Sequence, residues 1–587
     1  MGVHQRPYGK HFAPDDCSGL ARSGLATSRC RGSDRSAQRG EVAHGAGMCP
    51  AGNDSLSGDV AERAERSSNM MSFLIIIGRI TGFIRTTAQA WALGLTGLAS
   101  AYTVAAAMPN MLYELVVGGM LITSFLPVYV AVKKSLGRQG ASDYASNLLS
   151  LVLILMGVLT VVSFACAAPI IWTQSAGAAD DFDFALSVWF FRWFVCEIIL
   201  YALSSIISGV LNAERDYFWS NAAPILNNVI TISSFAIYGY LVNTAGVAWH
   251  DAVIVLAIGN PLGVAVQVFS QVPALRRHGV RLHLHVDLRD PALRQTLSIG
   301  VPTLVVTFAS FPTTAVMSSC ALSITAAGAS IAYYSRVWYV LPFSIFAVPL
   351  SVSLFTELSD CRVHGDVAGF LDCFTGGVRK VLFTLIPMAM FLVAFAPCLI
   401  AVFASGTFDA ESTAMTVGYL QAMALALPLY GLSSYLQKVC SSMMRMNFYA
   451  VATCIAAVIQ VVVCLWLTPI YGLYVVPVSS VFFYGAIDLV TIVRLRSELG
   501  PIGLRSIVSS SVRACTFGLA GSFLGMGIIS VLEMLVGPCQ GMLRGVLYAA
   551  AGGLPALVVT YGAAFMLHMS DAPFFDAVFS RVLRRAR

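Results

Sequence analysis

Arginine side chains inside long apolar segments are the residues of this sequence best placed to do chemistry. They are Arg79, Arg85, Arg192 and Arg336. Each costs about 2.5 to 3.5 kcal/mol on insertion scales if it lies near the centre of a membrane helix. The same segments hold fewer acids, of which Glu114 and Glu197 are the clearest, so complete pairing would still leave surplus positive charge. Because a guanidinium group donates two parallel hydrogen bonds to a phosphate, these arginines favour a phosphate or pyrophosphate ligand.

Arg79 and Arg85 are six residues apart, which is about 9 Å along a helix and about 240° around it. They cannot share one face, but they can line a wide cavity at two depths, especially if Gly78 and Gly82 bend the helix or admit close neighbours. The alternative for Arg79 is snorkelling to the headgroups. Arg192 has a structural interpretation, either paired with Glu197 or reaching outward. Polar side chains in other segments, such as Asn110, can assist binding, although most such residues simply hydrogen bond between helices.

Composition determines what kind of element must position these side chains. Hydrophobic residues make up 57% of the 587 residues, charged residues 11%, and the mean hydropathy is +0.76. Soluble domains carry about 25% charged residues, so a soluble enzyme is excluded. A membrane helix needs about 20 mostly apolar residues, and fourteen such segments are predicted. They are 72–94, 98–131, 143–172, 184–211, 217–242, 251–274, 294–322, 327–356, 374–404, 413–442, 447–468, 471–494, 508–534 and 544–568.

The lysines and arginines between these segments, or within six residues of a segment end, predict the orientation, because loops retained in the cytoplasm carry their excess. With the N-terminus inside, the cytoplasmic loops and C-terminus hold 22 Lys and Arg, and the outer loops hold only Arg544. A miscount by one segment would reverse every later loop. The asymmetry therefore predicts an even number of spans and cytoplasmic termini in a multi-pass membrane protein.

Four regions follow from composition and an internal similarity. Residues 1–69 are rich in Gly, Ser and Arg and are predicted to be a disordered cytoplasmic tail; the alternative is that translation starts at Met48, Met70 or Met71. The segments that begin at Leu211 and Met443 resemble each other weakly, at an offset of six spans. This predicts a six-helix half over 70–275, a second over 276–500, and two additional helices with a basic C-terminus over 501–587, around a central cavity.

The sequence gives little support for disulfide, metal-binding or enzymatic chemistry. Eight of the fourteen cysteines lie in predicted spans without close pairing and are expected to be packing residues. His283 and His285 lie in a cytoplasmic loop without nearby ligands at metal-binding spacing. No motif of hydrolysis or ATP use occurs in a suitable context. We expect no enzyme activity, metal, cofactor or nucleic-acid partner; the membrane potential or a coupling ion is the expected source of energy.

Several motifs resemble the MurJ (MviN) lipid II flippases of the multidrug/oligosaccharidyl-lipid/polysaccharide exporter superfamily. They are GRITGFIR from Gly78, MPN from Met108, GGxLxxxFLP from Gly118, SGVLNAERDYFWSNAAPILNN from Ser208, GVAVQVFSQVPALRRHG from Gly263, YYSR from Tyr333 and VFASGTFDAESTA from Val402. They appear in the family's order over about residues 72 to 445. The resemblance implies fourteen helices with cytoplasmic termini, as counted above.

The resemblance also implies roles for particular residues. Arg79 and Arg85 match two arginines thought to face the central cavity and engage a lipid-linked pyrophosphate, and Asn110 matches a polar cavity position. The candidate substrate-binding residues are therefore Arg79, Arg85, Asn110, Glu114 and Arg336. The sequence departs from the family where it has Ser100 in place of an acid and Tyr113 and Glu114 in place of two arginines. YYSR replaces YYxDR, so Arg336 lies one position early, about 100° around the helix.

The predicted function is transfer of an undecaprenyl-pyrophosphate-linked peptidoglycan precursor, lipid II, from the inner to the outer leaflet of the bacterial cytoplasmic membrane. Alternating access of the two halves would serve cell-wall synthesis and cell shape. The partners are the lipid-linked precursor, membrane lipids and, as a further option, cell-wall synthesis proteins. The alternatives are export of another lipid-linked oligosaccharide or polysaccharide precursor, a cation-coupled drug antiporter, which would need acidic cavity residues, and a non-transporting membrane scaffold.

Overall fold

The computed structural model describes residues 54–118, 125–280, 283–403 and 410–567, together with 569 and 571. Contacts divide the chain between Glu62 and Arg63, and the description below concerns the second unit. The described part contains helices and no strands. The helices are α1 (Asp54–Leu93), α2 (Gly97–Tyr113), α3 (Leu126–Ala165), α4 (Ala167–Ser175), α5 (Phe184–Phe194), α6 (Glu197–Ala213), α7 (Tyr217–Asn243), α8 (Trp249–Arg277), α9 (Pro291–Ile324), α10 (Gly328–Pro342), α11 (Val348–Val363), α12 (Val367–Ala401), α13 (Ala410–Ala424), α14 (Leu427–Ser442), α15 (Met446–Tyr471), α16 (Val475–Leu499), α17 (Leu504–Val536) and α18 (Met542–Met566), with π-helical turns η1 (Glu114–Gly118) and η3 (Phe343–Ala347).

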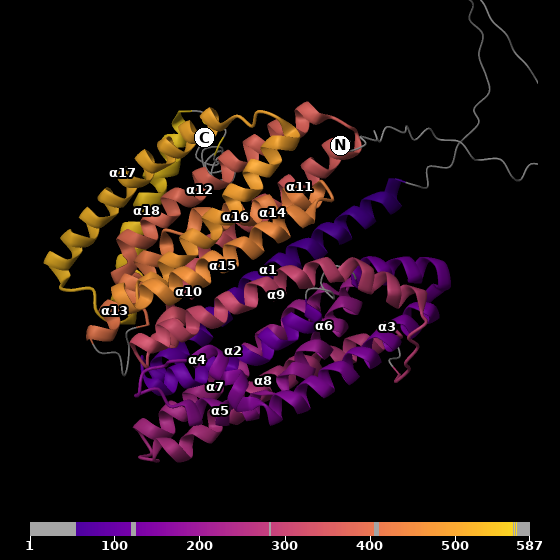
Figure 1. Ribbon diagram of the computed structural model, residues 1–587, viewed down its shortest axis with the longest axis horizontal. Helices are drawn as coiled ribbons and strands as arrows, with labels where there is room; N and C mark the ends of the chain where they lie inside the picture. Colours follow the sequence, from indigo (N-terminus) through magenta and orange to yellow (C-terminus); the bar gives the residue numbers. More distant parts are fainter. Residues whose placement is uncertain are drawn as a thin grey trace, which may run out of the picture. The chain divides into compact units, whose positions relative to one another are not determined.

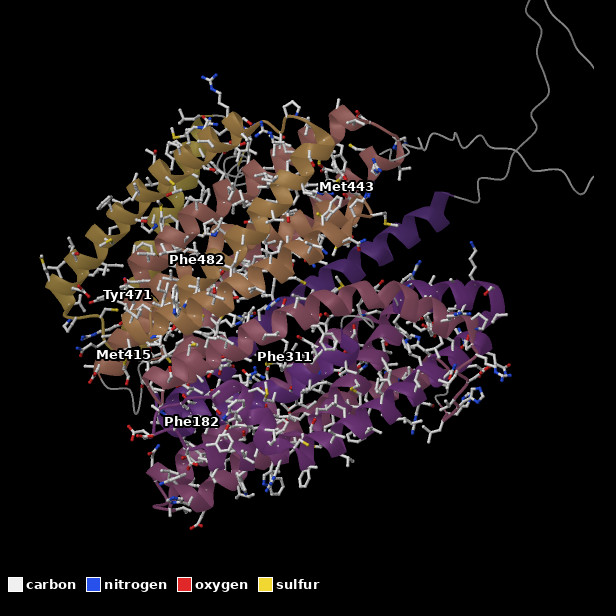
Figure 2. The ribbon with its side chains drawn as sticks, viewed as in Figure 1. Phe182, Phe311, Met415, Met443, Tyr471 and Phe482 are labelled. Atoms are coloured by element: carbon white, nitrogen blue, oxygen red, sulfur yellow. The ribbon has the colours of Figure 1, made fainter. Side chains whose placement is uncertain are left out.

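The prediction of an all-helical, multi-pass membrane protein is confirmed. In the described ranges, nine helices are long and apolar enough to cross a membrane, and eleven spans result if each of two bent pairs is one span. The bent pairs are α5 with α6, at 41°, and α13 with α14, at 43°. The remaining predicted spans coincide with α1, α2 and α9. Apolar side chains such as Tyr471 and Phe482 are exposed on the outer faces of the helices, where lipid would contact them (Figure 2).

Boundaries differ from the prediction around the second and third spans. We expected a loop between residues 131 and 143, but helix α3 runs through this stretch and is interrupted only at Gly137. Gly137 has φ 73°, a left-handed conformation that glycine adopts without steric cost, so one residue replaces the expected loop. The third span then breaks at Cys166, where α3 gives way to α4.

Two large hydrophobic clusters organise the helices. The first buries side chains of α2 to α8, for example Tyr102 against Phe190, Phe194 and Phe235 at ring distances of 5.4 to 5.5 Å. The second buries side chains of α10 to α18. Helix α9 contacts α3 and α4 on one side and α15 on the other, and Figure 1 shows it between the purple and the orange helices. The two clusters therefore belong to two bundles that share α9 as a common neighbour.

The weak internal similarity corresponds to two turns with the same backbone geometry. Arg215, between α6 and α7, has φ 62°, and Met444, between α14 and α15, has φ 56°. In both turns the following amide donates to a carbonyl five residues back, from Asp216 to Leu211 and from Arg445 to Cys440. A non-glycine residue pays a steric cost in this region. The two turns therefore share one local backbone geometry, and the internal repeat stays a prediction.

A buried carboxylate anchors the first of these turns. The Lys133 ammonium donates to both oxygens of Glu214 at 2.7 Å, and the Tyr129 hydroxyl donates to one of them at 3.1 Å. Burial would raise the pKa of the Glu214 carboxyl, but these hydrogen bonds and the Lys133 charge outweigh it, so the pKa lies below its ordinary value. The pair ties the turn after α6 to α3.

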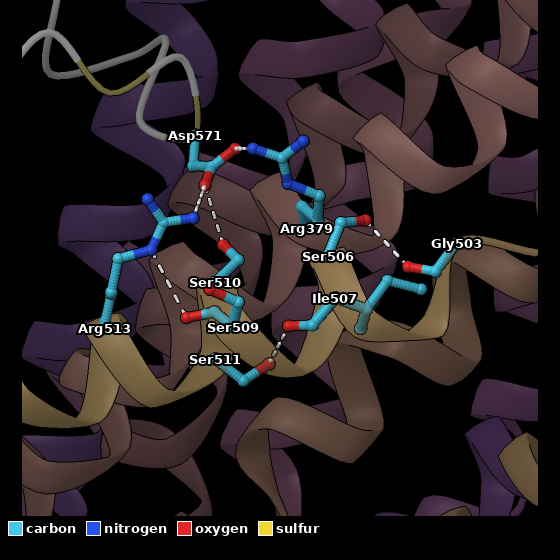
Figure 3. A network of polar contacts seen from close by, with 9 residues as sticks. All are labelled: Arg379, Gly503, Ser506, Ile507, Ser509, Ser510, Ser511, Arg513 and Asp571. Carbon is cyan, nitrogen blue, oxygen red and sulfur yellow. Dashed lines mark hydrogen bonds and ion pairs between the residues drawn. The ribbon is translucent and has the colours of Figure 1, made fainter.

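Helices α17 and α18 pack closely through glycines. A Cβ on Gly525 would lie 2.7 Å from the carbonyl oxygen of Gly552, and a Cβ on Gly552 would lie 2.9 Å from that of Gly525. Gly521 and Gly525 form the small-xxx-small pattern that lets membrane helices approach closely. Beyond α18, Asp571 is buried between Arg379 of α12 and Ser510 and Arg513 of α17 (Figure 3).

Candidate functional site

Arg79, Arg85 and Arg336 line one cavity of about 290 Å³, which we call the arginine cavity. Its other lining residues are Gly78, Gly82, Phe83, Thr86, Tyr333, Val337, Val340, Leu341 and Ser344. No acidic side chain lies among them. Three positive charges around one cavity repel each other unless an anion lies between them. The arginine cavity is therefore suited to a ligand with several negative oxygens.

Helix α1 contributes Arg79 and Arg85 to this cavity despite their different faces. The lining residues of α1 span Gly78 to Thr86, more than two turns, and Gly78 and Gly82 are among them. A Cβ on Gly82 would be in ordinary contact with Asn228 of α7, at 3.7 Å. Because the cavity extends along more than two turns of α1, two arginines 240° apart both reach it.

Helix α10 contributes Arg336 from the opposite wall. Tyr333, Arg336, Val337 and Val340 follow the i, i+3, i+4, i+7 spacing of one helix face. The one-residue shift relative to the family pattern therefore still directs Arg336 into the cavity with the α1 arginines.

Aromatic side chains pack the two walls of this cavity against each other. Phe83 of α1 meets Trp338 of α10 edge to face at 5.0 Å, and both rings contact Phe403 at 5.6 and 5.8 Å. Such pairs are each worth about 0.5 to 1.5 kcal/mol beyond the area they bury. The spacing of the arginines thus depends on apolar packing around the cavity.

A second cavity of about 270 Å³ shares Arg85 and Tyr333 with the first. We call it the amide-hydroxyl cavity because its polar side chains are neutral apart from Arg85. They are Gln89, Tyr102, Thr103, Asn110, Tyr201, Thr231, Asn260 and Tyr333. Tyr102, Tyr201 and Tyr333 line this cavity together with Arg85, so their hydroxyls surround the guanidinium. Amides and hydroxyls can both donate and accept, as sugars and peptides require of a binding site.

Arg85 and Tyr333 form the wall between these cavities, where the two bundles meet. The arginine cavity is lined by Phe83, Val337 and Val340, which pack on the second cluster. The amide-hydroxyl cavity is lined by Tyr102 and Phe235 of the first cluster. Any relative movement of the bundles would therefore change both cavities at this wall.

Asn110 and Glu114 lie on the first-bundle side of the site. Asn110 lines the amide-hydroxyl cavity and donates from Nδ2 to Oε1 of Glu114 at 3.0 Å. Glu114 itself is exposed and is among the lining residues of neither cavity. It orients Asn110 and is separated from the three arginines.

The other departures from the family pattern have structural explanations. Ser100 is fully buried, and its hydroxyl lies 3.2 Å from that of Ser330 of α10, where an unpaired acid would be costly. Tyr113 is buried beside Tyr201, with ring centres 6.4 Å apart. Neither residue is among those that line the arginine cavity.

Arg192 and Glu197 do not pair with each other. Arg192 is exposed, with its guanidinium 5.9 Å from the ring centre of Phe164. Glu197 is fully buried and accepts from Nδ2 of Asn260 at 3.0 Å, while interacting electrostatically with Arg85. The structural interpretation of Arg192 therefore fits its position, through a contact that we did not predict.

The sequence motifs pointed to charges and overlooked the neutral residues around them. Tyr333 lies within the YYSR motif, yet only the structure shows that it lines both cavities. Gln89 donates to Thr103 at 3.0 Å across the α1–α2 pair. The sequence could have indicated Gln89 as a neighbour of Arg85, because it follows Arg85 by four residues on the same helix face.

Comparison with known proteins gives the family. A model of the family described as "Lipid II flippase MurJ" matches residues 89–537, a range that begins just after Arg85. The "Probable lipid II flippase MurJ" of Rhizobium tropici is 25% identical over 365 residues, which cover 61% of this chain and 67% of that protein. The "Lipid II flippase MurJ" of Burkholderia cenocepacia is 24% identical over 505 residues, covering 85% and 87%.

Solved structures show the same fold. "Lipid II flippase MurJ, inward closed conformation" aligns with a TM-score of 0.66 at 18% identity, over 85% of this chain and 99% of that one. An inward-facing multidrug resistance MATE family transporter of the MOP superfamily aligns with a TM-score of 0.62 at 15% identity, over 73% and 96%. With a family match over most of its length, this chain belongs to the lipid II flippase MurJ family.

Proposed function

We propose that this protein transfers lipid II, or a closely similar polyprenyl-pyrophosphate-linked glycan, from the inner to the outer leaflet of the bacterial cytoplasmic membrane. The observation that carries the proposal is the arginine cavity, where three arginines meet without an acid among the lining residues. Family membership supplies the cargo class, because the matched family is described as lipid II flippases. The Lys and Arg distribution supports cytoplasmic N- and C-termini.

The two cavities suit different parts of such a cargo. The pyrophosphate would lie in the arginine cavity, held by Arg79, Arg85 and Arg336 through charge-assisted hydrogen bonds. The sugar and peptide groups would lie in the neighbouring amide-hydroxyl cavity, beyond the wall formed by Arg85 and Tyr333. Bound cargo would thus contact residues of both bundles, which couples its binding to their relative position.

An apolar groove suits the polyprenyl tail. It measures about 630 Å³ and lies among α12, α13, α14 and α17, with Met390, Val393, Leu425 and Phe523 among its lining residues. Its lining is almost entirely apolar, so an isoprenoid chain is matched there as well as it is by the surrounding lipid tails. The tail would remain in this groove or in lipid while the head group crosses.

Transfer of an anion outward is assisted by an inside-negative membrane potential. The potential is worth about 2.3 kcal/mol per charge per 100 mV. It acts on the pyrophosphate as it moves out, or on the emptied cationic cavity as it returns inward. The second route requires that Arg85 keeps its charge after the cargo has left.

The test is depletion of the protein in its own host with replacement by variants. The measurement is the fraction of lipid II accessible to a label applied outside. Arg85→Ala should abolish accessibility and raise total precursor, because the shared wall loses its charge. Arg192→Ala is the matched control, since it removes an arginine outside both cavities and should retain activity at equal abundance. A fully active and normally abundant Arg85→Ala protein would refute pyrophosphate capture.

The same assay separates the alternatives. If depletion leaves labelled lipid II unchanged and no second flippase compensates, the cargo is a different lipid-linked glycan, which competition with other headgroups would identify. A cation-coupled drug antiporter is disfavoured by the arginine cavity, and unchanged efflux of a cationic dye on deletion would remove it. A scaffold acting through residues 1–69 predicts loss of function when they are deleted, whereas a transporter should retain its core function.

A further inference from the structure

A second apolar groove lies on the outer face of the second bundle, where α15 begins and α16 ends. Its volume is about 680 Å³, and its apolar walls are formed by Phe448, Val451, Leu489, Val490 and Val493. Val451, Leu489 and Val493 are each more than half exposed, so the groove opens toward the hydrocarbon of the membrane. It lies on different helices from the groove among α12, α13, α14 and α17, and it shares no residue with the arginine cavity.

Two arginines meet at one end of this groove. The guanidinium of Arg494 lies 5.1 Å from the ring centre of Phe448, and that of Arg445 lies 5.7 Å from the same ring. Among the described residues, the ion pairs include neither arginine. Cation–π contacts hold the side chains in place but leave their charge uncompensated. The groove therefore ends at a localised positive charge.

The direction of the groove matches that of a lipid molecule. Arg445 is the residue before α15, and Arg494 lies in the last two turns of the antiparallel helix α16. Val451 is six residues beyond Arg445, and Leu489 is five before Arg494, so the apolar walls extend roughly 8 to 9 Å from the arginines along both helices. The charge lies at the membrane surface and the apolar walls run inward.

The charge distribution gives the leaflet. The predicted orientation places Arg445 and Arg494 on the cytoplasmic side. The cytoplasmic leaflet carries anionic phospholipids, which attract basic residues near its surface by about 1 kcal/mol each. An uncompensated pair of arginines above an apolar groove is complementary to a phosphate attached to an acyl chain.

We propose that this groove binds one anionic phospholipid of the cytoplasmic leaflet. Arg445 and Arg494 hold the phosphate through charge-assisted hydrogen bonds, Asn447 provides a further polar contact, and one acyl chain lies between α15 and α16. The groove is backed by a small hydrophobic cluster that joins α14, α15 and α16, including Tyr449, Ala456 and Ile487. The lipid therefore stabilises the packing of α15 and α16 at a place separate from the proposed cargo site.

The test is native mass spectrometry of the full chain with phosphatidylglycerol or phosphatidylcholine of identical acyl chains. Wild-type protein should retain one phosphatidylglycerol at least tenfold more tightly than phosphatidylcholine. Arg445→Gln with Arg494→Gln should remove this preference. The matched control is Arg496→Gln with Arg505→Gln, which changes the net charge equally outside the groove and should change the affinity less than twofold.

A second variant tests the apolar wall without changing charge. Val490→Trp fills the groove and should weaken phosphatidylglycerol binding at least fivefold, with unchanged elution and helix content showing that the chain is folded. Equal retention of the two lipids by wild-type protein would overturn the proposal, as would equal losses in the groove and control variants. Displacement of the bound phosphatidylglycerol by an equimolar amount of lipid II would also overturn it, because the groove would then belong to the cargo path.

Discussion

The contact between Asp571 and Arg379 is expected to hold the segment after α18 against α12, and its strength can be measured. Arg379 donates from one guanidinium nitrogen to Asp571 at 2.6 Å, and Ser510 of α17 donates to the other carboxylate oxygen at 2.8 Å (Figure 3). Arg513 is more distant, at 3.8 Å. The Asp571 side chain is only 4% exposed, whereas those of Arg379 and Arg513 are 27% and 44% exposed.

These differences give an expected order of magnitudes. A short hydrogen bond between charged groups contributes about 1.5 to 3 kcal/mol, and the low exposure of Asp571 places the Arg379 pair in this range. The Arg513 pair is long and more exposed, so solvent screening limits it to under about 1 kcal/mol. Loss of Asp571 also leaves Arg379 partly buried without its partner, which adds to the cost. Asp571→Ala should therefore favour local opening by about 2 to 4 kcal/mol.

Hydrogen–deuterium exchange measures this opening where it occurs. The Met569 amide donates to the Ala564 carbonyl at 3.1 Å and lies two residues from Asp571. Its exchange should be at least tenfold faster in Asp571→Ala, since about 1.4 kcal/mol corresponds to a factor of ten. A double-mutant cycle of Arg379→Gln with Asp571→Asn should give a larger coupling energy than Arg513→Gln with Asp571→Asn. Equal couplings, or an Arg379 coupling below about 0.5 kcal/mol, would refute the reasoning.

Three further perturbations follow from the fold. Because the pKa of Glu214 is lowered, its pair with Lys133 stabilises the protein fully above the ordinary carboxyl pKa of about 4.3. This stabilisation is lost as the pH falls through the lower folded-state pKa. The difference in melting temperature between wild type and Glu214→Gln should therefore shrink on acidification, and a difference that grows would contradict the argument. Gly525→Ala should destabilise the α17–α18 pair by about 1 to 3 kcal/mol in a denaturant titration, because its Cβ meets a backbone oxygen, whereas Gly527→Ala, with open space around it, should not. Met444→Gly should raise the free energy of unfolding by about 0.5 to 1 kcal/mol, because it removes the strain of a left-handed side-chain-bearing residue. Met443→Gly, at φ −80°, should lower it. A loss of stability in both variants would show that Met444 makes a contact worth more than its strain.

Much of the fold was predictable because membrane helices follow from local composition. Each predicted span coincides with one or two helices, since the bilayer requires about 20 apolar residues per crossing and every backbone group must be paired within the helix. The breaks were less predictable. The single-residue interruption at Gly137 and the bend between α5 and α6 depend on how neighbouring helices pack, and no proline marks either of them.

The candidate site was likewise predictable only in part. The sequence alone identified Arg79, Arg85 and Arg336 as unusual, because a charge in an apolar segment is costly wherever the helix lies. The sequence could not decide whether residues 240° apart on α1 share a cavity. That depends on α10 approaching α1 through Phe83, Trp338 and Phe403. Glu114 shows the opposite case, since its charge attracted attention but its position leaves it outside both cavities.

Whether a neutral residue lines the site depends largely on the tertiary structure. Tyr333 carries no charge, so an apolar segment tolerates it without any sign of function, and only the packing of α10 against α1 places it beside Arg85. The sequence by itself determined the membrane class, the helices and the surplus of arginine, because burial costs act on each residue separately. Packing between helices distant in sequence decided which arginines share a cavity, since that contact depends on the shapes of both surfaces at once.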